Sequence, residues 1–322
     1  MHYTKIATRC RKSHAIVIIT KGKLMIRTIT TTAILALTAG TAMADGLNYA
    51  RFSYDLNNFS DDSGADDIKT SVFQGEFEYS IDQFVLGANL TNFAVDVSDE
   101  SSLTVYDVWA GFVATPEIMA GLGLTGASFG DEDTNGAEFF GQYTTDQFGI
   151  GVRVAQLDFE EDNISTILNG QVSVTPEVEL GAVIWKDSEF DGTGYMLSTD
   201  YDNDLIDARA YYQSNTEAES GFFAVRGSYK VADMFRISAL YETVVGDEEF
   251  DVSFYTIGGG YEFVDGAWID VNYGQIDFGD EFEKVDRIQA AISFEMGDRL
   301  RLDNQFEQDT TDDSLMGSGS YF

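Results

Sequence analysis

The chain has 322 residues and a formal net charge of −36, with 19 Lys and Arg residues against 55 Asp and Glu residues. This charge excludes binding to the phosphate backbone of nucleic acids, which requires a basic surface. Aromatic residues make up 13% of the chain, and this content argues against the disorder that high charge with few aromatic residues would indicate.

The first 44 residues have the pattern of export and processing segments rather than of a folded domain. Segment 25–44 begins with a basic region, continues through a short apolar stretch and ends in Ala-Met-Ala. This order of parts indicates a signal peptide, and the apolar stretch is far shorter than the roughly 20 residues of a membrane-spanning helix. We therefore expect an upstream extension at 1–24, a signal peptide at 25–44 with cleavage after Ala44, and a mature domain at 45–322.

The mature chain lacks two reactive side-chain types. Residues 1–44 contain both histidines and the single cysteine, together with seven basic and no acidic residues, so the mature chain keeps 12 basic residues against 55 acidic ones. A chain without cysteine cannot be a disulfide scaffold. A chain without histidine lacks the base of Ser-His and Asp-His catalytic arrangements. We therefore expect no enzymatic activity and no cofactor. We also expect no metal site, because the acidic clusters lack EF-hand spacing.

Acidic clusters and tight turns alternate along the mature chain. Nine clusters alternate with eight turns, and one cluster plus one turn recurs every 30 residues or so, which is typical of a repeated supersecondary unit. In chain order the clusters lie at 60–67, 96–100, 131–133, 158–162, 187–191, 216–220, 247–251, 277–283 and 307–313. The turns lie at 80–84, 114–118, 144–148, 174–178, 202–206, 230–235, 263–268 and 295–300.

The intervals between turns and clusters alternate apolar and polar residues with a period of two, which predicts β-strands. In one interval Phe84, Leu86 and Leu90 share a face, and the same alternation recurs at 235–242 and 286–296. We count 18 such segments, with 16 as the alternative count.

A soluble β-sandwich and a transmembrane β-barrel both contain alternating strands. Long and short connections alternate without exception here, the strands are long enough for a tilted membrane crossing, and an even count lets every edge close. These features favour an all-β fold: a closed antiparallel up-and-down transmembrane barrel of about 18 strands, with short periplasmic turns and acidic extracellular loops.

The only two prolines, Pro116 and Pro176, both lie in the tripeptide Thr-Pro-Glu. Proline fixes φ and removes a hydrogen-bond donor, which suits a tight turn and would break a strand ladder. We expect both at periplasmic turns, two hairpins apart in the repeat.

The chain ends in Gly-Ser-Gly-Ser-Tyr-Phe, with Phe322 last. With its strand pattern, this ending resembles Gram-negative outer-membrane β-barrels of the porin superfamily, whose final strand ends in an aromatic residue that the barrel-assembly machinery recognises. One departure is that the last nine residues lack the strong apolar alternation usual in that strand.

The resemblance implies an outer-membrane porin that lets small hydrophilic solutes and ions diffuse passively through a water-filled lumen. A substrate-specific channel and a non-transporting structural or adhesive barrel remain the alternatives. The acidic loops indicate a solvated rim, or a surface that binds lipopolysaccharide through divalent cations. A homotrimer, common among such porins, stays open.

Charged residues on the polar face of the strands are the candidates for lining the lumen. They are Arg51, Arg153, Arg209, Arg226, Arg236, Arg287, Arg299, Arg301, Asp107, Glu242, Asp270 and Asp303, with Arg299 and Arg301 expected on strand 17. One hypothesis gathers Arg51, Arg287, Arg299 and Arg301 into a single basic wall that filters ions. The competing interpretation pairs the arginines with neighbouring carboxylates that hold the barrel rigid.

Porins of this superfamily usually fold a long third loop into the lumen. Here the third outer loop, 128–136, is too short to reach far inward. The lumen is then either open and lined only by its wall, or narrowed by another segment, such as the loop at 60–69.

Overall fold

The computed structural model describes residues 46–61, 67–96, 101–129, 132–156, 164–188, 192–218, 220–246, 252–279 and 284–302. The expected extension, signal peptide and cleavage site lie outside these residues, as do Asp303 and Phe322. The described parts of the acidic clusters connect or end the strands.

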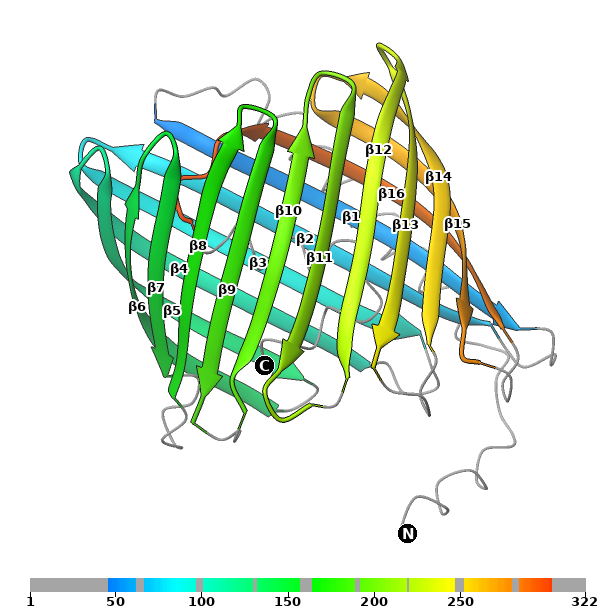
Figure 1. The fold of residues 1–322 in the computed structure, drawn as a ribbon, viewed down its shortest axis with the longest axis horizontal. Helices are drawn as coiled ribbons and strands as arrows, with labels where there is room; N and C mark the ends of the chain where they lie inside the picture. The colour runs from blue at the N-terminus through cyan, green and yellow to red at the C-terminus, as the bar shows by residue number, and fades with distance from the viewer. Residues whose placement is uncertain are drawn as a thin grey trace, which may run out of the picture. The chain divides into compact units, whose positions relative to one another are not determined.

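Sixteen antiparallel strands form one closed barrel (Figure 1). The strands are β1 (Leu47–Asp61), β2 (Ile68–Ile81), β3 (Phe84–Asp96), β4 (Ser101–Thr115), β5 (Ile118–Phe129), β6 (Glu132–Thr144), β7 (Phe148–Gln156), β8 (Ile164–Thr175), β9 (Val178–Asp187), β10 (Gly194–Asp202), β11 (Ile206–Asn215), β12 (Gly221–Ala232), β13 (Phe235–Val245), β14 (Ser253–Val264), β15 (Ala267–Asp277) and β16 (Val285–Gly297).

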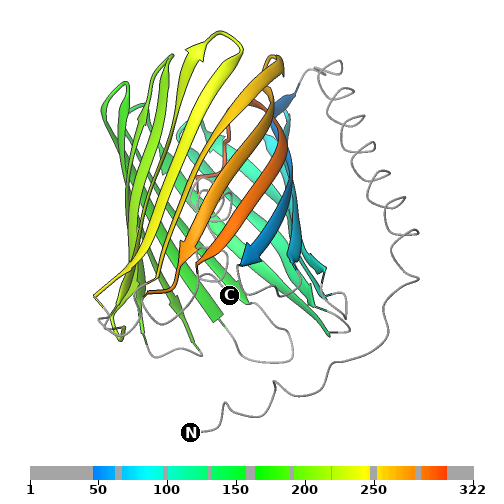
Figure 2. The same cartoon turned by 90° about the vertical axis from the view of Figure 1, so that its right-hand side faces the viewer.

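The barrel closes between its first and last strands. β1 pairs with β16 from Tyr49 opposite Gly297 to Asp61 opposite Val285, and Figure 2 shows the two strands side by side in blue and orange. This pairing uses the free edge of β1, so no edge is left for strands 17 and 18. The closed transmembrane-type barrel is confirmed, with the alternative count of 16 strands in place of 18.

Short turns lie at one end of the barrel, as the sequence pattern predicts. Pro116 and Pro176 lie in the two-residue turns that join β4 to β5 and β8 to β9. In both turns the threonine hydroxyl accepts a hydrogen bond from the glutamate backbone N–H and donates one to the glutamate carboxylate, at 2.9 Å in the first turn and 3.0 Å in the second. The repeated tripeptide is thus a self-contained turn.

The two faces of the strands differ in polarity. Large apolar side chains such as Leu122 and Ile257 lie on the outer surface, and each has an exposed fraction above one half. Buried polar and charged side chains, among them Glu78 and Gln289, lie on the alternate positions that face the lumen. This is the alternation expected of a barrel in lipid. Within the described residues, no helix is long and apolar enough to cross a membrane.

The inner wall is not uniformly polar, although the sequence pattern suggested so. Apolar side chains on β8 to β12 pack into a buried inward cluster, whose members are Ile167, Val183, Met196, Tyr211, Phe222 and Ala224. A second inward cluster on β3 to β6 includes Trp109 and Phe140.

Candidate functional site

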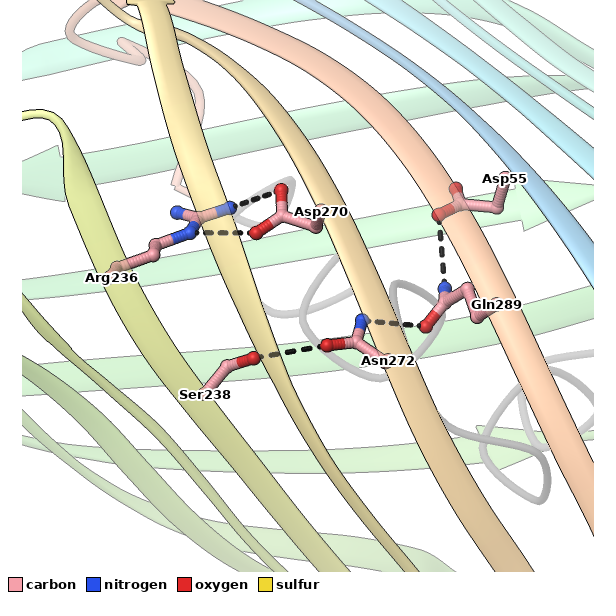
Figure 3. Close-up of polar contacts among 6 residues, drawn as sticks. All are labelled: Asp55, Arg236, Ser238, Asp270, Asn272 and Gln289. Atoms are coloured by element: carbon pink, nitrogen blue, oxygen red, sulfur yellow. Dashed lines mark hydrogen bonds and ion pairs between the residues drawn. The ribbon is translucent and has the colours of Figure 1, made fainter.

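A hydrogen-bonded ladder crosses the lumen wall from β13 through β15 and β16 to β1 (Figure 3). Arg236 of β13 forms a bidentate pair with Asp270 of β15: its Nε donates to Oδ1 at 2.9 Å and its Nη2 donates to Oδ2 at 2.7 Å. The Arg236 guanidinium also lies 4.2 Å from the ring centre of Trp268. A bidentate pair of this kind fixes both side chains in one geometry.

The second part of the ladder is a chain of three neutral side chains that ends at a carboxylate. The Ser238 hydroxyl donates to Asn272 Oδ1 at 3.1 Å, and Asn272 donates to Gln289 Oε1 at 2.9 Å. Gln289 then donates to Asp55 Oδ1 at 3.0 Å. All members are strand residues, so the barrel register itself holds this wall.

Glycines on β14 make the ladder possible. Gly260 lies between Arg236 and Asp270 in the strand register, and a Cβ there would overlap Asp270 Oδ1. Gly258 lies between Ser238 and Asn272 in the same way, where a Cβ would overlap Asn272 Oδ1. The side chains of β13 and β15 therefore meet across β14 because β14 presents no side chain between them.

Residues 298–302, which follow β16, turn into the lumen; we name them the lumenal strap. The turn begins at Gly297, whose φ of +78° is a left-handed conformation and whose Cβ would collide with Asn48 O. The backbone then runs along the inner wall past β1 to β2, where the Leu300 N–H donates to Glu78 Oε2 at 2.6 Å. Gln142 of β6 donates to Leu300 O at 2.6 Å and accepts from the Leu302 N–H at 2.9 Å.

The two arginines of the strap bind carboxylates of the barrel wall. Arg299 Nε lies 3.2 Å from Glu76 Oε1, and its Nη2 donates to the Tyr49 hydroxyl at 2.6 Å. Arg301 Nη1 lies 2.8 Å from Asp107 Oδ2, and its Nη2 lies 2.8 Å from Glu138 Oε1. The carboxylate acceptors belong to β2, β4 and β6, so the strap links the end of β16 to strands two, four and six places away in the barrel order.

Arg301 is enclosed by four side chains, which we name the Arg301 pocket. Asp107 and Glu138 bind its two terminal nitrogens, and the rings of Trp109 and Phe140 lie 5.3 Å and 4.4 Å from its guanidinium carbon. The Arg301 side chain is 0% exposed. A fully desolvated guanidinium is stable only with such complete compensation.

The structure places the strand-borne candidates on the inner wall. Arg153 of β7 lies 3.1 Å from Glu138, and Arg209 of β11 lies 3.5 Å from Asp200. Arg226 stands opposite Arg209 in the register, and Arg287 donates to Asn57 at 2.8 Å. The remaining strand positions are Arg51 on β1, Asp107 on β4, Arg236 on β13, Glu242 on β13 and Asp270 on β15.

Two sequence expectations need correction. Arg299 and Arg301 do not lie on a strand, because β1 already pairs with β16 and leaves no edge for them. The four arginines of the proposed basic wall do not form one surface: Arg301 reaches β4 and β6, whereas Arg287 stays beside β1. The pairing of arginines with wall carboxylates describes the strap better than a continuous basic surface does.

The strap was missed by sequence reasoning because Arg-Leu-Arg-Leu at 299–302 imitates strand alternation. The third outer connection is short, with β5 ending at Phe129 and β6 beginning at Glu132. Among the described residues, the strap, which follows the last strand, enters the lumen. Trp109 faces inward opposite Gly87 of the neighbouring strand, and a tryptophan at an inward position is a signal that the inner wall is not purely polar at this level.

No known protein family and no curated protein matches this chain by sequence. Among solved structures, a multiply mutated form of Rh. blastica porin is similar with a TM-score of 0.52 at 13% identity, covering 78% of this chain and 99% of that chain. A triple mutant of Rhodopseudomonas blastica porin has a TM-score of 0.51 at 14% identity with the same coverage. Similarity at this level of identity establishes the fold, and the chain has the fold of a porin.

Proposed function

We propose that this barrel is an outer-membrane porin through which small hydrophilic solutes and ions diffuse passively. The observation that carries the proposal is a closed ring of 16 strands with apolar residues outside and charged residues inside. Barrels of about eight strands are filled by their own side chains, whereas barrels of about 16 to 18 strands enclose an aqueous channel.

The candidate pore-lining residues act in this proposal as a wall of fixed, mutually compensated charge. Pairs such as Arg236–Asp270 carry permanent charge of both signs, which orients water and polar solutes in the lumen. The lumenal strap narrows the channel near the tight-turn end, because its arginines reach from the end of β16 to carboxylates of β2, β4 and β6. It takes the place of the third loop that narrows other porins.

The decisive experiment is single-channel recording of the purified, folded barrel in planar bilayers of defined lipid. A porin gives discrete, voltage-tolerant conductance steps in potassium chloride. Absence of conductance from protein that keeps its β-sheet circular dichroism and its heat-modifiable migration would eliminate the channel and favour the structural or adhesive barrel.

A substrate-specific channel is the second candidate function, and the Arg301 pocket is the observation that favours it. A pocket of defined chemistry inside the lumen binds one class of solute better than others. Such a channel shows saturable block of its ion current by its solute, whereas a general porin does not.

The route to the membrane is part of the same proposal. We infer export by the signal peptide with cleavage after Ala44, recognition of Phe322 by the barrel-assembly machinery, and no enzymatic activity. Mass spectrometry of the mature protein from outer-membrane fractions tests the cleavage site. Removal of divalent cations from membranes tests contact with lipopolysaccharide, and the mass of the detergent-extracted protein tests a homotrimer.

A further inference from the structure

The Arg301 pocket has the chemistry of a guanidinium receptor. Two carboxylate oxygens bind the two terminal nitrogens of the fork, each at 2.8 Å, and two aromatic rings lie within 5.3 Å of its carbon. Carboxylates in this arrangement match the planar fork of a guanidinium group, and aromatic faces attract the cation between them.

The barrel wall is shaped to hold these four side chains. Trp109 lies over Gly87 of β3, where a Cβ would overlap the indole ring, and Phe140 lies over Gly121 of β5, where a Cβ would overlap the phenyl ring. At Gly123 of β5 a Cβ would come within 2.6 Å of Glu138 Oε1. Three inward glycines on the flanking strands β3 and β5 thus leave room for the side chains that form the pocket.

The occupant of the pocket is not part of the barrel wall. Residues 298–302 form no strand; the Asp298 N–H donates to the backbone carbonyl of Asn48, and the backbone from Leu300 to Leu302 is bound by side chains of the wall. Arg301 therefore enters the pocket from the lumen, as a solute would. The residues of the ladder differ in this respect, because both members of each pair are fixed by strand register.

The carboxylates of the pocket favour a cation. Asp107 and Glu138 bind the two terminal nitrogens of Arg301, and Glu138 also lies 3.1 Å from Arg153 of the wall. Loss of Arg301 takes one cation away from these buried carboxylates, and a buried charge with less compensation is costly until another cation replaces it.

We propose that the Arg301 pocket is a solute-binding site for guanidinium-bearing cations, and that Arg301 occupies it as an internal substitute for the solute. The inference rests on the proposed channel function and names the class of solute that the channel selects. A solute with a guanidinium group competes with Arg301 for Asp107 and Glu138, and its binding releases the strap from the pocket.

The test measures binding to the full barrel in detergent micelles, by the fluorescence of Trp109 in Arg301→Ala. Methylguanidinium chloride is the probe, urea is the neutral planar control, and potassium chloride controls for ionic strength. We expect saturable change with a dissociation constant on the order of 1 mM for methylguanidinium and at least about tenfold weaker change for urea. Adding Trp109→Phe to Arg301→Ala removes the signal and assigns it, since the chain has 3 tryptophans.

Arg301→Lys serves as the second variant should Arg301→Ala fail to fold. It keeps the charge but not the planar fork, so methylguanidinium displaces the ammonium group at a higher concentration than it needs in Arg301→Ala. In both backgrounds, Asp107→Asn with Glu138→Gln abolishes the response. A folded Arg301→Ala or Arg301→Lys barrel whose fluorescence responds to methylguanidinium no more than to urea overturns the proposal.

Recording the same variant in bilayers separates this inference from the proposed function. Conductance that methylguanidinium blocks and urea does not supports both. A saturable fluorescence response in a barrel that never conducts supports the pocket and contradicts the porin. Conductance without any selective response to methylguanidinium supports the porin and contradicts the pocket.

Discussion

The two sides of the lumen use the same chemistry in different ways. On β13 to β16 and β1, a guanidinium and a carboxylate are both strand residues, and Gly260 on the strand between them lets them meet. On β2 to β6 the carboxylates are strand residues, but the guanidinium groups of Arg299 and Arg301 come from the lumenal strap.

On the first side the barrel strands hold both partners of each pair, whereas on the second side another cation could replace the guanidinium group. The Arg236–Asp270 pair joins two strand residues of the wall, whereas the arginines of the strap come from residues that form no strand. Glycines shape both sides, since Gly87 and Gly121 make room for Trp109 and Phe140 as Gly260 does for the ladder. We expect the strap side to determine what passes through the lumen, and the ladder to have little effect on it.

The largest effect on stability is expected on the strap side. In Asp107→Asn with Glu138→Gln, Arg153 and Arg301 lose their carboxylate partners in a buried environment. We expect the free energy of unfolding to fall by about 3–5 kcal/mol, as for other broken buried ion pairs. Urea-induced unfolding in detergent, followed by tryptophan fluorescence, measures it. If the free energy of unfolding falls no further than in Arg236→Ala, Arg301 is not held by these two carboxylates as described.

A smaller loss is expected from the ladder. In Arg236→Ala, Asp270 loses a bidentate partner, but Arg236 is 26% exposed and water replaces part of the interaction. The free energy of unfolding should fall by about 1–3 kcal/mol, with the conductance nearly unchanged, because the strap does not contact this pair. A large rise in conductance of Arg236→Ala would remove the distinction between the two sides.

The repeated tight turn provides the baseline. Thr115→Val and Thr175→Val each remove the hydroxyl that bonds the following glutamate, one turn lying on the strap side and the other away from it. Each should cost about 0.5–1.5 kcal/mol, the usual net value of such hydrogen bonds. The two losses should be equal within error by the same unfolding assay. Unequal losses would show that the strap side differs in more than its lumen contacts.

Most of the fold can be predicted from the sequence because its determinants are local. The period-two alternation gives the strands, and the turn residues give their ends: Pro116 and Pro176 mark the same turn twice. The strand count cannot be predicted in this way. Whether 299–302 forms a strand depends on a free edge, and β16 already uses the edge of β1.

For the candidate site, the sequence predicts which types of residue face the lumen but not which of them meet. The alternation of inward and outward positions along each strand identifies inward arginines and carboxylates, so Arg153, Asp107 and Asp270 appear among the candidates. Which of them meet depends on contacts between segments that are not neighbours in the barrel, as between the strap and β4. The pairing of Arg301 with Asp107, 194 positions away, leaves no local trace in the sequence.

We propose that the strap restricts the lumen through its two arginines. Single-channel conductance and reversal potential of Arg299→Ala with Arg301→Ala, compared with the unaltered chain in a potassium chloride gradient, test this restriction. We expect a severalfold larger conductance and a shift toward cation selectivity, because Glu76, Asp107 and Glu138 lose their strap partners. Conductance and selectivity equal to those of the unaltered chain would contradict it.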